Sequence, residues 1–165
     1  MDFKKFENLL KEGIIELYNE ILEENDKVYS LAICDDNFFN GMFISIRTEE
    51  IDYDDGDWYD IYDPEEFDIF DPENDKIDIC KNMILEYLDK FDLEEEFMQV
   101  YKFKDEVIDI YIYVLKELRE SVFKGKINLD VSIRDYFREE DMIEIFGELN
   151  DEKETKIYAK LLNEE

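Results

Sequence analysis

Hydrophobic residues recur every three or four positions near the start of the chain, which is the spacing of one face of an α-helix. These positions are Phe3, Phe6, Leu10, Ile14, Leu17 and Ile21. Lysine and glutamate fill much of the remaining surface, and the polar pair Asn25-Asp26 interrupts the pattern. The spacing therefore predicts an amphipathic helix over residues 2–24.

Three shorter runs have the character of β-strands. Residues 28–34 and 42–47 are apolar runs joined by a polar loop that contains the turn pair Asn40-Gly41, which favours an antiparallel hairpin. Residues 127–133 alternate apolar and polar positions, which predicts a third strand.

Helical spacing returns after residue 76 and predicts helices over about 77–91, 93–122, 138–147 and 152–162. We expect the second of these to break near Phe103-Lys104, where the apolar stripe shifts, and to end near Lys124-Gly125. Gly147 or Asn150 would end the helix predicted over 138–147. The predicted fold is a single α+β domain over 1–165, in which a small, mostly antiparallel sheet is packed by about five helices.

Residues 49–78, called the acidic segment below, differ sharply from the rest of the chain. Fifteen aspartates and glutamates stand there against one base, Lys76, which gives the segment a charge of −14. Both prolines and the only tryptophan, Trp58, also lie there, among several tyrosines and phenylalanines. Disordered acidic tails lack aromatic residues, so this composition indicates a different kind of segment.

The whole chain is strongly acidic, with 48 Asp and Glu against 19 Lys and Arg and a net charge of −29 over 165 residues. Direct binding to nucleic acid or to an anionic membrane is disfavoured, because both need exposed lysine and arginine. The 45% of hydrophobic residues is enough for a packed core, which argues against a wholly disordered chain.

Histidine is absent, which removes the mechanisms that rest on a histidine base or a histidine metal ligand. Cys34 and Cys80 are too few for a secreted disulfide scaffold, and we expect both to be buried and reduced. No signal peptide or membrane-length apolar run is visible, which predicts a cytoplasmic location. We expect no cofactor.

Two stretches resemble a bacterial family known as an uncharacterised domain of unknown function. The first runs from Lys27 through the strand 28–34 to Thr48-Glu49-Glu50, and the second from Val114 through Gly125 to Val131-Ser132-Ile133. Members of that family occur around toxin-immunity and other bacterial conflict loci, so the resemblance implies a protein that binds a partner. It implies no catalytic residues, and the chain departs from the family most over 51–75.

Three kinds of site could use acids of the acidic segment or of the C-terminal stretch. For each of them, the simpler explanation is that the acids are solvent-exposed surface charges. An EF-hand with Gly56 at its sixth position would place Ile51, Tyr53 and Tyr62 at ligand positions, so the calcium motif fails. The pattern Asp151-x-Lys153 fits a minimal metal-nuclease motif, but a helical, charged C-terminal stretch explains it more simply. A glycosidase needs two carboxylates at a set separation, and the sequence does not single out one such pair among 48 acids.

The function predicted from these observations is that of a non-enzymatic bacterial immunity protein, which binds a cognate cationic toxin domain through an acidic and aromatic face. Carboxylates would pair with lysine and arginine of the toxin while the aromatic rings fill pockets between them. The candidate partner-binding residues are Asp52, Asp54, Asp55, Asp57, Trp58, Tyr59, Asp60, Tyr62, Asp63, Glu65, Glu66 and Asp68. A DNA mimic that blocks restriction or defence proteins, and a carboxylate-dependent metal-binding protein, are the alternatives.

Overall fold

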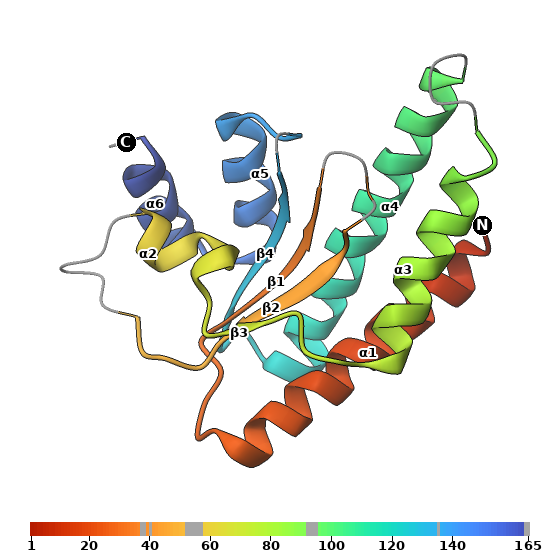
Figure 1. Ribbon diagram of the computed structural model, residues 1–165. Coiled ribbons are helices and arrows are strands. Elements are labelled where there is room, and N and C mark those ends of the chain that lie inside the picture. The colour runs from red at the N-terminus through yellow and green to blue at the C-terminus, as the bar shows by residue number, and fades with distance from the viewer. Residues whose placement is uncertain (37–38, 40, 52–57, 92–95, 135, 164–165) are drawn as a thin grey trace.

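A four-stranded sheet with helices on both faces forms the centre of the computed structural model (Figure 1). The structure describes residues 1–36, 39, 41–51, 58–91, 96–134 and 136–163, with the backbone alone at residues 59 and 60. The strands are β1 (Ser30–Asp35), β2 (Phe43–Arg47), β3 (Ile69–Phe70) and β4 (Asn128–Ile133). The helices are α1 (Phe3–Glu24), α2 (Trp58–Tyr62), α3 (Asp75–Leu88), α4 (Phe97–Leu118), α5 (Glu139–Leu149) and α6 (Glu152–Leu162), with a 3-10 turn, η1 (Pro64–Glu66), and a π-helical turn, η2 (Arg119–Phe123).

The strand order in the sheet is β3-β2-β1-β4. The predicted hairpin is present, with Leu31 of β1 opposite Ile46 of β2 in an antiparallel pair. β3 extends the sheet antiparallel to β2, whereas β4 runs parallel to β1 with Leu129 beside Leu31. The predicted α+β class, with a mostly antiparallel sheet and a long N-terminal helix, is therefore confirmed.

The two faces of the sheet are covered by different helices. Figure 1 shows α1, α3 and α4 on one side and α2, α5 and α6 on the other. Leu31 and Ile33 of β1 belong to the large core formed with α1 and α4, while Ala32 and Cys34 contact Phe67 on the opposite face. Because side chains alternate along a strand, β1 is buried on both faces.

The helix α4 does not break where the apolar stripe shifts, so this prediction was wrong. Phe103 packs against Phe3 and Tyr87, with ring centroids 6.1 and 4.4 Å apart, while the neighbouring Lys104 lies 5.3 Å from the ring of Phe39. Phe103 and Lys104 are both buried because α4 has neighbours on more than one side. The buried stripe of α4 is therefore wider here, and the helix does not bend. α4 continues through η2, and the chain turns at Lys124 and Gly125, both with left-handed backbone angles.

The boundary between α5 and α6 lies at Asn150 rather than at Gly147, which is inside α5. Asn150 also joins this boundary to the sheet, because its amide donates to the Leu129 carbonyl at 2.7 Å and its oxygen accepts from the Leu129 N–H at 2.8 Å. α5 and α6 are thereby held against β4.

Candidate functional site: a cavity at the end of β1 and β4

Residues 58–78, the part of the acidic segment from its tryptophan onward, fold into α2, η1, β3 and the beginning of α3. Their aromatic residues Trp58 and Tyr62 are 8% and 3% exposed. The ring of Tyr62 lies 5.3 Å from Phe146 and 4.9 Å from Tyr158, and Trp58 lies 5.9 Å from Tyr158. In this packing neither ring projects into solvent, so the expected role of Trp58 and Tyr62 as rings that enter a partner's pockets does not agree with the structure.

Two acids of the segment, Asp63 and Asp68, are held in place by hydrogen bonds from backbone N–H groups. Asp63 caps η1 and accepts from the Glu65 N–H at 3.0 Å, and Asp68 accepts from the Thr48 N–H at 2.7 Å. Glu65 and Glu66 are exposed. The remaining predicted acids Asp52, Asp54, Asp55 and Asp57, and the side chains of Tyr59 and Asp60, lie outside the described residues.

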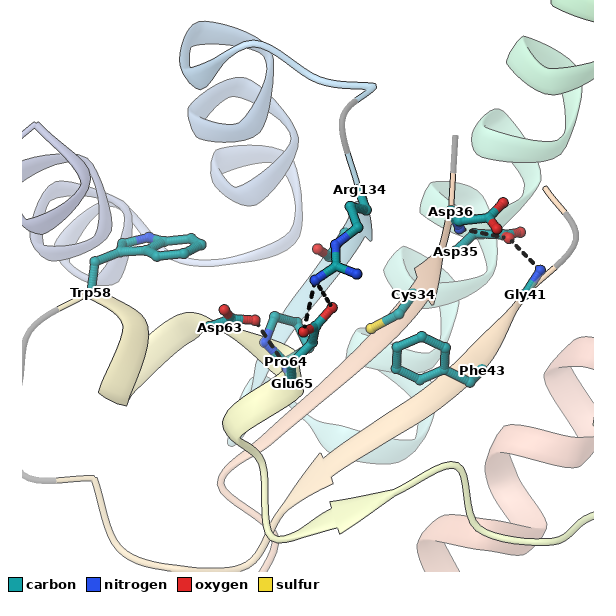
Figure 2. Close-up of a pocket in the computed structure, with 11 residues that line it drawn as sticks. Cys34, Asp35, Asp36, Gly41, Phe43, Trp58, Asp63, Pro64, Glu65 and Arg134 are labelled. Atoms are coloured by element: carbon teal, nitrogen blue, oxygen red, sulfur yellow. Dashed lines mark hydrogen bonds and ion pairs between the residues drawn. The ribbon is translucent and has the colours of Figure 1, made fainter. Parts of the chain in front are cut away.

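A cavity of about 540 Å³ lies beside these residues, where the parallel strands β1 and β4 end (Figure 2). It is lined by Cys34, Asp35, Asp36, Gly41, Phe43, Trp58, Asp63, Pro64, Glu65, Ser132 and Arg134. The register places Cys34 beside Ser132, with both side chains on the face of the sheet that η1 covers. The carboxyl ends of parallel strands are a common place for ligands in proteins with parallel pairing, and the volume is in the range of small-molecule pockets.

The lining of the cavity contains more acids than bases. Asp35, Asp36, Asp63 and Glu65 are the acids of the lining, and Arg134 forms an ion pair with Glu65 at 3.0 Å. Figure 2 shows this pair bridging β4 and η1 across the cavity. The carboxyl group of Asp35 turns to the opposite face of the sheet, where it meets Tyr111 of α4.

Asp35 ends β1 and is only 3% exposed. Its carboxylate accepts hydrogen bonds from the N–H groups of Asp36 at 2.9 Å and Gly41 at 3.2 Å, and from the Tyr111 hydroxyl at 3.2 Å. Burial raises the pKa of Asp35 to about 7, although these hydrogen bonds act in the opposite direction. The ammonium group of Lys104, on α4, interacts with Asp36 and Asp35. Burial lowers the pKa of Lys104, and the charges of these two acids oppose that shift.

A second buried carboxyl group, Asp130, lies in the middle of β4 beside Ala32 of β1. One of its oxygens accepts from the Val131 N–H at 2.8 Å. Burial, together with the charge of Asp63, raises the pKa of Asp130 to about 7, although the hydrogen bond from the Val131 N–H acts in the opposite direction. Sequence reasoning singled out neither Asp35 nor Asp130, although each is an acid within or at the end of an apolar run, a position that can indicate burial.

The two cysteines are free and buried, as predicted. Burial raises the pKa of the Cys80 thiol to about 12 and that of the Cys34 thiol well above its usual range. Both groups are therefore thiols at neutral pH, whereas nucleophilic chemistry needs the thiolate. Within the described residues, no three potential ligands among Cys, Asp and Glu come together as a metal site would require.

Comparison of the chain with models of protein families, with curated proteins and with solved structures found no match. The helices of the described part of the chain include none that is both long and apolar enough to cross a lipid bilayer.

Proposed function

We propose that the chain is a non-enzymatic bacterial immunity protein that acts in the cytoplasm by binding and neutralising a cationic toxin domain. The observation that carries this proposal is the arrangement of acids over 63–68. Asp63 and Asp68 are fixed by hydrogen bonds from backbone N–H groups, Glu65 is paired with Arg134, and Glu66 is exposed. Carboxylates that are already ordered lose little side-chain freedom on binding, which favours affinity for a basic surface.

The apolar contact of this interface is assigned to Phe70 in place of the buried Trp58 and Tyr62. Phe70 is 53% exposed and lies on the edge strand β3, immediately after the acids of η1 and Asp68. Its ring packs on Phe43 with centroids 4.4 Å apart, which supports it from beneath. Exposed aromatic rings beside charged groups are typical anchors of protein interfaces.

The charge of the chain supports fast and selective association. A net charge of −29 produces a negative field that attracts a basic partner and raises the association rate at low salt. The protonated thiols of Cys34 and Cys80 argue against catalysis by cysteine.

The experiment uses the full chain as bait in a lysate of its host, washed first at low and then at moderate salt. A single basic protein that survives moderate salt is then expressed alone and together with the chain. We expect growth arrest alone and rescue on co-expression, and we expect Phe70→Ala to weaken the complex by more than tenfold. Recovery of many DNA-binding proteins, all released by moderate salt, would favour a DNA mimic and overturn this proposal.

The matched control is Tyr113→Ala. Tyr113 is exposed to a similar degree as Phe70, but it belongs to α4, on the opposite side of the sheet from η1. Its replacement should leave the affinity for the basic partner unchanged. An equal loss in both variants would show that the acidic segment is not the binding surface.

A further inference from the structure

We propose that one buried water molecule is bound between the side chains of Ser30 on β1 and Asp130 on β4 and is part of the folded structure. The site is separate from the cavity at the end of β1 and β4. It lies nearer the beginning of these strands, between the sheet and the side chains of Tyr62 in α2 and Phe146 in α5. The inference does not depend on the proposed function.

The space at this position has the size of a single water molecule. A second, small cavity there leaves about 10 Å³ for the centre of a water-sized sphere. On this measure one water molecule needs at least roughly 10–15 Å³. The cavity is lined by Ser30, Leu31, Tyr62, Phe67, Asn128, Leu129, Asp130 and Phe146, and all of these except Asn128 are buried. One water molecule fits there, whereas an organic ligand does not.

Ser30 contributes a buried hydroxyl group to this cavity. The residue is 4% exposed, and within the described residues its Oγ atom makes no hydrogen bond. Alternation along β1 places Ser30 on the same face of the sheet as Ala32, which contacts Phe67. Burial of a hydroxyl group without a hydrogen bond is costly, and most such groups have a protein or water partner. The Ser30 hydroxyl therefore points to a bound molecule that can hydrogen-bond.

Asp130 contributes the second polar group. It lies beside Ala32 in the parallel pair, so its side chain is on the same face of the sheet as that of Ser30. One carboxyl oxygen accepts from the Val131 N–H at 2.8 Å, and within the described residues the other oxygen makes no hydrogen bond. Burial raises the pKa of Asp130 to about 7, so at lower pH the carboxyl group can donate as well as accept. A water molecule here has hydrogen-bonding groups on two strands.

Water fits these groups better than a metal ion or an empty space does. Calcium and magnesium take six or more oxygen ligands, and within the described residues no three potential ligands among Cys, Asp and Glu come together. Cavities that stay empty are apolar, whereas this one has the Ser30 hydroxyl and the Asp130 carboxyl group in its wall.

The first test is a high-resolution crystal structure of the full chain. We expect density for one water molecule at about 2.6–3.2 Å from Ser30 Oγ and from a carboxyl oxygen of Asp130. A cavity without density, or a Ser30 hydroxyl that donates to a protein group instead, would overturn the site.

The second test counts bound water in solution by magnetic relaxation dispersion of the water oxygen nucleus, which detects molecules held for longer than the protein takes to tumble. Ser30→Val replaces the hydroxyl group by methyl groups, one of which takes the space of the water, and valine suits a β-strand. We expect the number of long-lived water molecules to fall by one.

The matched control is Ser132→Val, at a serine of β4 that lines the larger cavity and not the small one. Its number of long-lived water molecules should equal that of the original chain. An unchanged number in Ser30→Val, or the same loss in both variants, would contradict a water molecule at Ser30. If Ser30→Val does not fold, the crystal structure of the original chain decides.

Discussion

At the scale of single residues, Asp130 is the group whose burial has the clearest energetic consequence. Its pKa in the folded chain is about 7, against an ordinary value near 3.8. Between pH 3.8 and pH 7, the folded state therefore keeps a proton on Asp130 that the unfolded state has already lost. The contribution of Asp130 to stability is present at low pH and is lost as the pH rises through about 7.

We therefore expect Asp130→Asn to stabilise the fold, and to do so more at pH 8 than at pH 5. Asparagine carries no charge, and its oxygen still accepts from the Val131 N–H. The two units between pH 5 and the folded pKa correspond to a difference of up to about 3 kcal/mol in the free energy of unfolding. Urea unfolding of both proteins at the two pH values measures it.

The control for that measurement is Glu66→Gln, at an exposed position of η1. Its effect on stability should be small at both pH values. A stabilisation by Asp130→Asn that is the same at pH 5 and pH 8 would show that the carboxyl group does not titrate as its burial indicates.

The residues that line the cavity show how much of the site can be predicted from the sequence. Trp58, Asp63 and Glu65 were singled out by composition and do line the cavity, because the acidic segment covers the end of the sheet. Asp35 and Arg134 were not singled out. Their place in the cavity depends on the parallel pairing of β1 with β4, strands that are separated by almost a hundred residues.

At the scale of elements, the periodic segments were predictable and the short ones were not. α1 buries a stripe of side chains at helical spacing, and β1, β2 and β4 bury nearly all of their residues, so the sequence displays the first as a period and the strands as short runs rich in apolar residues. α2, η1 and β3 have five residues or fewer, too few for a period. α2 also acquires its apolar partners, Phe146 and Tyr158, from α5 and α6 far along the chain.

The packing of α1 on α3 gives a prediction of its own. A Cβ atom at Gly13 would lie 2.8 Å from Cδ1 of Ile77, closer than such atoms approach. We expect Gly13→Ala to destabilise the fold by about 1–3 kcal/mol, even though alanine favours helix formation by roughly 1 kcal/mol over glycine. Thermal and urea unfolding measure the change.

A second substitution tests whether this contact is the cause. Ile77→Val removes the Cδ1 atom that the new methyl group would meet, so it should recover part of the stability lost in Gly13→Ala. On its own Ile77→Val should cost about 0.5–1.5 kcal/mol. Strict additivity of the two substitutions would mean that the destabilisation arises elsewhere.

At the scale of the whole molecule, the net charge of −29 acts on folding and on binding with opposite signs. Repulsion among the acids destabilises the folded chain, and salt screens it. Attraction to a basic partner is screened by the same salt. Stability of the chain alone should therefore rise with ionic strength while affinity for the partner falls.

This opposition is tested by raising NaCl from about 10 mM to about 150 mM, which shortens the Debye length from roughly 30 to 8 Å. We expect the Tm of the free chain to rise by several degrees and the dissociation constant of the complex to increase at least tenfold, mainly through slower association. Sucrose at matched osmolality controls for effects unrelated to charge and should leave the affinity unchanged. A complex that tightens with salt would mean that apolar contacts such as Phe70, rather than the ordered carboxylates of 63–68, dominate the interface.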